Sequence, residues 1–140
     1  MRILVVGGLL FSIISSQAHA ANIYVSVTAP DQVGKSFAYS LREGIASSRQ
    51  HKLVNLETEA AFMLRVVTLN PQDREGLSTI YSATLTMSNF NKDNPLDYFL
   101  TSWVGQCGSS RTTECARNVI AGVDDEITPI VEALAKRLRK

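Results

Sequence analysis

The chain contains few side chains whose types and spacing suit catalysis. His51 is the only histidine after residue 20, and no serine lies in a G-x-S-x-G sequence, the turn that exposes the nucleophile in many hydrolases. A lone histidine near the start of a strand is more often a surface residue than a catalytic base. The chain also lacks an H-E-x-x-H motif and any cysteine–histidine cluster of the kind that binds zinc. We therefore expect no enzyme activity, no metal and no other cofactor.

Two further motifs have residue types that could bind a metal ion or a phosphate group. Asp124-Asp125-Glu126 is the densest acidic run, but three consecutive side chains of a helix spread over much of its circumference and do not converge on one metal ion. Gly34-Lys35-Ser36 is similar to the end of a phosphate-binding loop but lacks the upstream glycine of G-x-x-x-x-G-K-[ST]. We interpret the first motif as a solvated helix face and the second as chance.

Residues 1–20 have the composition of a secretory signal peptide. Arg2 precedes an apolar run over residues 3–14, and Ala18 and Ala20 form an A-x-A cleavage site, while the run is too short to span a bilayer. We predict cleavage after Ala20, which leaves residues 21–140 as a single domain in the periplasm or secreted. The new N-terminal residue would be Ala21 rather than cysteine, so we do not expect a lipoprotein. No later segment is long and apolar enough to form a transmembrane span.

The charge balance argues against a polyanionic partner. The chain has 14 basic and 13 acidic residues, and loss of Arg2 with the signal peptide would make the two numbers equal. Tight binding to a phosphate backbone needs an excess of basic side chains, so we expect no nucleic-acid partner.

The only two cysteines are Cys107 and Cys115. An exported protein meets an oxidising compartment, and we predict that the two form a structural disulfide. The alternatives are a redox pair or a metal site, but the intervening sequence has neither C-x-x-C spacing nor a nearby histidine.

The N-terminal half of the predicted domain combines strands with one amphipathic helix. Alternating side chains predict a strand over residues 22–28, and Asp31 can cap the helix that follows. Apolar residues recur every four positions from Val33 to Ile45, so this helix should end near residues 47–48, with Gly44 permitting a close approach to the sheet. We predict a short strand over residues 51–56, one helical turn over 57–60, and an apolar strand over 62–69 that is covered on both faces.

The C-terminal half predicts a hairpin and a long helix. Residues 78–88 alternate cleanly and residues 97–104 form the next strand, with a turn-rich connection over 89–95. Apolar residues then recur from Ala116 to Leu138, and Pro129 should kink or split this helix. The order β-α-β-β-β-β-α indicates an α/β (α+β) fold, a single two-layer domain with a mixed sheet and two helices packed on one face. The other face would carry a row of serine and threonine residues and be more open.

Three segments resemble a group of small bacterial envelope domains. They are Ile23-Tyr24-Val25-Ser26-Val27, Leu41-Arg42-Glu43-Gly44-Ile45, and Glu59-Ala60-Ala61-Phe62-Met63-Leu64-Arg65-Val66. The resemblance is to the N-terminal domain of TolB and its relatives, including LpoB, PelC and CsgG-type proteins. It implies this fold and a role in envelope assembly or partner binding, not catalysis. The chain departs from the group in lacking a lipidation cysteine and in its cysteine pair.

The candidate interaction surface has two parts. Aromatic side chains of the predicted hairpin would bind a partner protein where they face outward, since aromatics dominate interface energetics. The basic C-terminus complements the helix dipole, or alternatively contacts anionic lipid or an acidic partner. The candidate residues are Tyr81, Tyr98, Trp103, Lys136, Arg137, Arg139 and Lys140.

We therefore predict a non-enzymatic protein-interaction module of the bacterial cell envelope. Its partner would be another envelope or secreted protein, and an edge strand could also pair with a second copy to form a homodimer. One alternative is an inhibitor or immunity-type protein that neutralises an exported enzyme by inserting residues 89–95 or 106–114. The other is a small-ligand carrier, or a hydrolase, with a closed pocket lined by polar groups.

Overall fold

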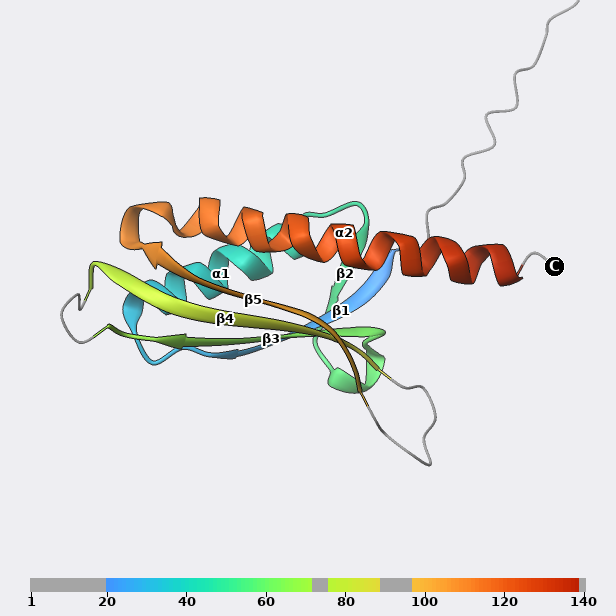
Figure 1. The fold of residues 1–140 in the computed structure, drawn as a ribbon, viewed down its shortest axis with the longest axis horizontal. Helices are drawn as coiled ribbons and strands as arrows, with labels where there is room; N and C mark the ends of the chain where they lie inside the picture. Colours follow the sequence, from blue (N-terminus) through green and yellow to red (C-terminus); the bar gives the residue numbers. More distant parts are fainter. Residues whose placement is uncertain (1–19, 72–75, 89–96, 139–140) are drawn as a thin grey trace, which may run out of the picture.

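A computed structural model describes residues 20–71, 76–88 and 97–138. The observed elements follow the predicted order, with the predicted turn over residues 57–60 present as a 3-10 helix and one further 3-10 turn before the last helix (Figure 1). The elements are β1 (Ala21–Thr28), α1 (Gln32–Ala46), β2 (His51–Val54), η1 (Glu57–Glu59), β3 (Phe62–Leu69), β4 (Ser78–Met87), β5 (Tyr98–Gly108), η2 (Ser109–Arg111) and α2 (Thr112–Leu138).

The five strands form one mixed sheet in the order β2-β1-β3-β4-β5. β1 pairs in parallel with β2 and β3, whereas β3, β4 and β5 pair antiparallel. Both helices lie on the same face of this sheet (Figure 1). The predicted two-layer α+β architecture and the predicted hairpin of β4 and β5 are therefore confirmed.

The core fills the space between the sheet and the two helices. Its sheet side comes from alternate residues of neighbouring strands, and its helix side comes from one stripe of each helix. Phe37 of α1 is fully buried and stacks on Tyr81 of β4, with ring centroids 4.6 Å apart. Fully buried members include Ile23, Leu41, Ile45, Leu64, Leu85, Val123 and Ile127.

Two glycines allow the helices to pack closely, although not where the sequence suggested. A Cβ atom on Gly44 would lie 2.3 Å from Cδ1 of Ile120, so Gly44 permits close approach to α2 and not to the sheet. A Cβ atom on Gly122 would lie 2.7 Å from the Trp103 ring, so it is Gly122 that brings a helix close to β5. The expectation for Gly44 was wrong about the neighbour because sequence periodicity does not show which helix face meets which element.

β3 is a central strand, but the prediction that both its faces are covered holds only at its start, where Met63 on the face away from the helices is 2% exposed. Its side chains that point toward the helices are buried, whereas Val67 and Leu69 on the opposite face are 45% and 61% exposed. α1 and α2 both occupy the other face of the sheet, so neither of them covers this side of β3 (Figure 1). An apolar side chain in the sequence of this strand therefore does not show that another element packs over it.

The C-terminal helix is not split at Pro129. α2 runs without interruption from Thr112 to Leu138 with Pro129 inside it. Proline removes one backbone hydrogen bond to the residue four positions earlier, which is Asp125. Pro129 and Asp125 are both exposed, so water can solvate the released carbonyl and the helix continues.

Strand ends follow pairing more than local pattern. β5 continues to Gly108, past the predicted end at residue 104, because its register with β4 extends to the pair Ser78 and Gly108. β2 ends at Val54, before the predicted end at residue 56, because its pairing with β1 stops there.

The predicted connection over residues 89–95 lies outside the described residues. In the described part of the chain, no helix is long and apolar enough to cross a membrane.

Candidate interaction surface

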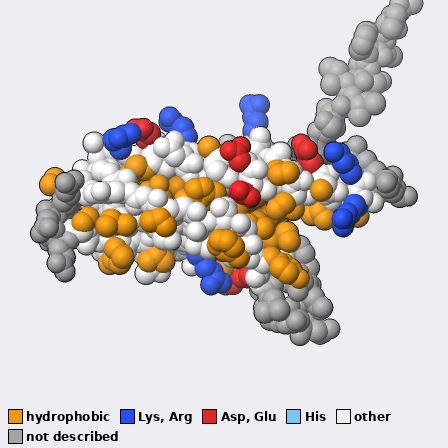
Figure 2. Space-filling view, in the orientation of Figure 1, with side chains coloured by type: hydrophobic (Ala, Val, Ile, Leu, Met, Phe, Trp, Pro, Cys, Tyr) orange, Lys and Arg blue, Asp and Glu red, His pale blue; other side chains and the backbone are white. Residues whose placement is uncertain are grey.

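The sheet face away from α1 and α2, which we name the uncovered face, carries a patch of exposed aliphatic side chains. Val67, Leu69, Ile80 and Val104 are 45%, 61%, 40% and 74% exposed, and we name these four residues the aliphatic patch. Leu69 lies directly opposite Ile80, and both Val67 and Val104 lie opposite Ser82, so the four side chains are neighbours on three adjacent strands. Figure 2 shows hydrophobic side chains gathered along the sheet side of the molecule, below the helices.

Polar but mostly uncharged side chains surround the aliphatic patch. Ser82 and Thr84 lie on this face, as the alternation of residues 78–88 predicted, and Ser102 of β5 lies opposite Thr84. Arg65 is the only charged side chain on this face of β3, β4 and β5, and it contacts Glu57 at 3.9 Å and Asp97 at 3.5 Å. The face therefore combines apolar area with neutral hydrogen-bonding groups, a mixture that suits contact with protein.

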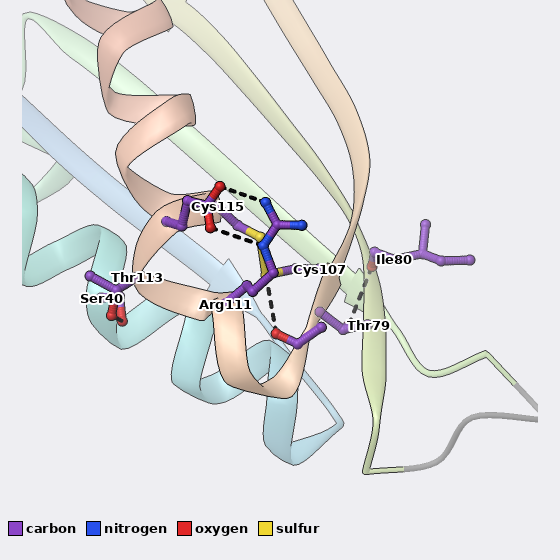
Figure 3. Close-up of a disulfide and its surroundings, with 9 residues drawn as sticks. Ser40, Thr79, Ile80, Cys107, Arg111, Thr113 and Cys115 are labelled. Atoms are coloured by element: carbon purple, nitrogen blue, oxygen red, sulfur yellow. Dashed lines mark hydrogen bonds and ion pairs between the residues drawn. A yellow bond between two sulfur atoms is a disulfide. The ribbon is translucent and has the colours of Figure 1, made fainter.

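The aliphatic patch was not predicted from the sequence. Ile80 interrupts a row of serine and threonine on β4, and Val104 lies between Ser102 and Gln106 on β5. These two interruptions were the available signal. The close-up in Figure 3 shows Thr79 directed toward the helices and Ile80 directed away from them. One residue of strand therefore separates a buried hydroxyl from an exposed aliphatic side chain.

The structure divides the predicted interaction residues among three places. Tyr81 and Trp103 lie on the helix-covered face, where Tyr81 stacks on Phe37 and Trp103 contacts Gly122, so these two are mainly core residues. Tyr98 is 54% exposed at the start of β5. Lys136 and Arg137 are exposed in the last turns of α2, which extend past the sheet (Figure 1). Arg139 and Lys140 lie outside the described residues.

Cys107 and Cys115 lie at disulfide-bonding distance, with their Cα atoms 6.1 Å apart (Figure 3). Cys107 is fully buried near the end of β5 and Cys115 lies in the first turn of α2. Beside them, the exposed Arg111 guanidinium donates two hydrogen bonds to the Glu114 carboxylate, at 2.9 and 2.5 Å. The Arg111 hydrogen bonds lower the pKa of Glu114, and the Glu114 hydrogen bonds raise the pKa of Arg111.

This corner is compact and does not match the inserting loop that the inhibitor hypothesis places at residues 106–114. These residues form the end of β5, η2 and the first turn of α2. The other proposed inserting segment, residues 89–95, lies outside the described residues. A shallow hollow of about 370 Å³ lies here, lined by Leu77, Ser78, Gln106, Gly108 and Arg111, and it is open to solvent rather than closed.

His51 is a buried structural residue, so the expectation of a surface position was wrong. Its side chain is 1% exposed, and its Nε2 atom is hydrogen-bonded to a carboxylate oxygen of Asp124 on α2. This pair joins the edge strand β2 to the long helix. It also means that Asp124 is not part of a purely solvated acidic face, although Asp125 and Glu126 are exposed. A histidine enclosed in this way cannot reach a substrate.

Asp31 holds α1 to two strands through one carboxylate. One oxygen accepts a hydrogen bond from the backbone N–H of Gly34 at 2.7 Å, which confirms the predicted helix cap. The other accepts from the hydroxyls of Thr68 on β3 and Thr79 on β4, at 2.9 and 3.0 Å. Burial raises the pKa of Asp31, but the hydrogen bonds outweigh it and lower the pKa below its usual value. All three hydrogen-bond donors to this carboxylate belong to the fold itself, so Asp31 has a structural role. Among the described residues, no three potential metal-binding side chains gather together.

Comparison with known proteins shows a shared fold without sequence similarity. No family model and no curated protein matches the sequence. The hypothetical protein CT253 from Chlamydia trachomatis is 10% identical with a TM-score of 0.50, covering 77% of this chain and 98% of that one. Protein XCC0632 from Xanthomonas campestris, of family DUF330, is 8% identical with a TM-score of 0.52, covering 86% of this chain and 90% of that one.

The solved structures also include a member of the group that the sequence resembles. The PelC dodecamer from Paraburkholderia phytofirmans is 11% identical with a TM-score of 0.40, covering 68% of this chain and 82% of that one. The fold that the resemblance implied is confirmed by the structures of CT253 and XCC0632, and at these identities the similarity concerns the fold alone.

Proposed function

We propose that the chain is a non-enzymatic protein-interaction module of the bacterial cell envelope, exported to the periplasm or secreted. The observation that carries the proposal is the aliphatic patch on the uncovered sheet face. Four large aliphatic side chains at 40–74% exposure, next to one another on three strands, form a surface that gains free energy when a partner excludes water from it.

The chemistry of this face indicates the kind of partner it suits. A partner surface would bury the aliphatic patch and hydrogen-bond to the surrounding serine and threonine hydroxyls. Arg65 already has Glu57 and Asp97 as neighbours, so the face does not demand a strongly acidic partner. We therefore propose another envelope protein with an apolar, neutral contact surface.

Two features support export. β1 begins at Ala21, immediately after the predicted cleavage point, and it lies inside the sheet between β2 and β3. The cysteine pair placed at bonding distance suits an oxidising compartment.

Site-specific photo-crosslinking in the producing bacterium tests the proposal. A photoreactive amino acid at Val67, in the centre of the uncovered face, should give a discrete crosslinked product that contains a second envelope protein. The control position is Tyr39, which is 67% exposed on α1. The proposal fails if Val67 gives no discrete product, or if Tyr39 gives the same product with the same yield.

A further inference from the structure

β5 is a long edge strand with few of the features that normally protect such an edge. It is the last strand of the sheet and spans 11 residues, whereas the opposite edge strand, β2, spans four and carries Lys52. An edge strand presents a row of backbone N–H and C=O groups that can pair with another chain. Within the described residues, β5 pairs only with β4, so its outer side has no partner strand.

Natural proteins block such edges with charged side chains, proline or bulges. The segment Tyr98–Gly108 contains no lysine, arginine, aspartate, glutamate or proline. Its one irregularity with β4 falls between Leu85 and Thr86, next to Leu100, and from Thr101 to Gly108 each residue has a single partner on β4. This second stretch is regular, uncharged and long enough to pair.

The α2 helix does not occupy the position beside β5. Trp103 lies on the helix-covered face, because it is opposite the buried Ala83, and Gly122 of α2 contacts the Trp103 ring there. α2 therefore packs above the strand, and the contact leaves the position next to β5 in the plane of the sheet available to another strand.

We propose that two copies of this chain associate through β5, paired antiparallel about a two-fold axis at Val104, so that two five-stranded sheets form one continuous sheet. A two-fold interface brings the same surface of each copy together, and the residue on the axis faces itself. Val104 is 74% exposed, and a pair of valines on the axis buries apolar area without opposing like charges.

The residues around Val104 are complementary in this arrangement. Ser102 would face Gln106 of the second copy on the uncovered side, which pairs two neutral hydrogen-bonding groups. On the covered side Trp103 would face Gly105 of the second copy, so the largest side chain of the strand meets a residue without one. The charges near the two ends of β5 have neighbours within the chain, Arg65 for Asp97 and Glu114 for Arg111.

Pairing through β5 joins a strand edge to a second copy, whereas the proposed function joins the uncovered face to another protein. The aliphatic patch includes Val104 and lies beside β5. Pairing would bring the two patches next to each other and extend the apolar face across the joint sheet.

Analytical ultracentrifugation of the purified processed protein tests the pairing. The wild type should show a concentration-dependent increase toward twice the monomer mass. Val104→Lys places two lysines opposite each other on the axis and should leave only monomer. Val67→Lys is the matched control, since it changes the same residue type on the same face but in the central strand β3, and it should dimerise like the wild type.

Disulfide crosslinking between two copies tests the pairing by forming a product, and so does not depend on a variant that disrupts the dimer. Val104→Cys should form a disulfide-linked dimer on oxidation, seen by non-reducing electrophoresis, and Val67→Cys should not. Circular dichroism melting of each variant checks that it is folded.

Three outcomes would overturn the proposal: a wild type that stays monomeric at all concentrations, equal disruption by both lysines, or equal trapping of both cysteines. Equal loss of the dimer with both lysine variants would indicate that two copies pack through their uncovered faces. A monomeric wild type would mean that β5 does not pair with a second copy, although a strand of a different protein could still pair with it. The photo-crosslinking at Val67 remains an independent test of the proposed function in every case.

Discussion

Asp31 illustrates how a single side chain can hold several parts of the fold together. It lies between β1 and α1 in the chain, and its carboxylate accepts hydrogen bonds from Gly34, Thr68 and Thr79. A Cβ atom on Gly34 would lie 2.1 Å from Oγ1 of Thr68, so only glycine lets α1 begin this close to β3. The sequence predicted the helix cap, because a cap is local, but not the two threonines, which are 37 and 48 residues away.

The lowered pKa of Asp31 predicts a pH-dependent contribution to stability. A carboxyl whose pKa is lower in the folded state stabilises the fold above its unfolded pKa of about 4, and this contribution is lost as the pH falls through the folded-state value. Asp31→Asn keeps a good helix cap but removes the charge. We expect it to lower the free energy of unfolding by about 1 kcal/mol at pH 7 and by less at pH 3.

Urea unfolding followed by circular dichroism at pH 7 and pH 3 measures this difference. Asp125→Asn is the matched control, because Asp125 is exposed on α2 and its substitution should have little effect at either pH. An equal loss of stability for Asp31→Asn at both pH values would contradict the role of the charge.

His51 marks the limit of sequence reasoning at the scale of residues. Its partner Asp124 is 73 positions away, and neither residue lies in a motif that would indicate the pair. The sequence therefore suggested a surface histidine and a solvated acidic run, whereas the tertiary structure joins the two.

At the scale of elements, the Cys107–Cys115 pair ties the end of β5 to the start of α2. The buried Cys107 sulfur and the first turn of α2 are brought together by the short η2 segment. We predict that this disulfide stabilises the protein by about 2.5 kcal/mol, a value that follows from the small loop it closes. Substituting both residues by alanine should lower the free energy of unfolding by about that amount.

Urea unfolding with and without reductant checks this prediction. Reductant should destabilise the wild type and leave Cys107→Ala/Cys115→Ala unchanged, which controls for effects of the reductant itself. Alkylation of both thiols in unreduced protein, detected by mass spectrometry, would disprove the disulfide.

Local periodicity correctly predicted whether a segment is a helix or a strand, but it did not predict where several of these elements end. The alternation of residues 78–88 and the four-residue repeat from Val33 to Ile45 placed β4 and α1 to within about two residues. The end of β5 at Gly108 depended on pairing with β4, and the continuity of α2 through Pro129 depended on solvent exposure. Neither pairing nor exposure can be read from one segment alone.

In the whole molecule, the two faces of the sheet have different roles. One face and the two helices form the core, and the other presents the aliphatic patch. This division is what makes a binding role the best-supported proposal. It also explains why the aromatic residues chosen from the sequence were only partly suitable, since Tyr81 and Trp103 belong to the covered face.

Export predicts a defined mature protein. When the full chain is produced in a bacterium with a general secretion pathway, the protein recovered from the periplasm should begin at Ala21. Ala20→Arg should block processing, because signal peptidase requires a small residue at this position. Intact-mass measurement distinguishes the two forms, and recovery of the unprocessed wild type from the cytoplasm alone would contradict the signal-peptide prediction.

The order and kind of the elements, the two-layer fold, the cap at Asp31 and the resemblance to envelope domains could all be predicted from the sequence. These properties rest on local periodicity, turn residues and short motifs, which one segment carries alone. Three features could be seen only in the folded molecule: α1 and α2 leave the aliphatic patch uncovered, β5 is an edge strand, and His51 contacts Asp124. These properties depend on which distant segments pack together, and that choice is made by the whole core at once.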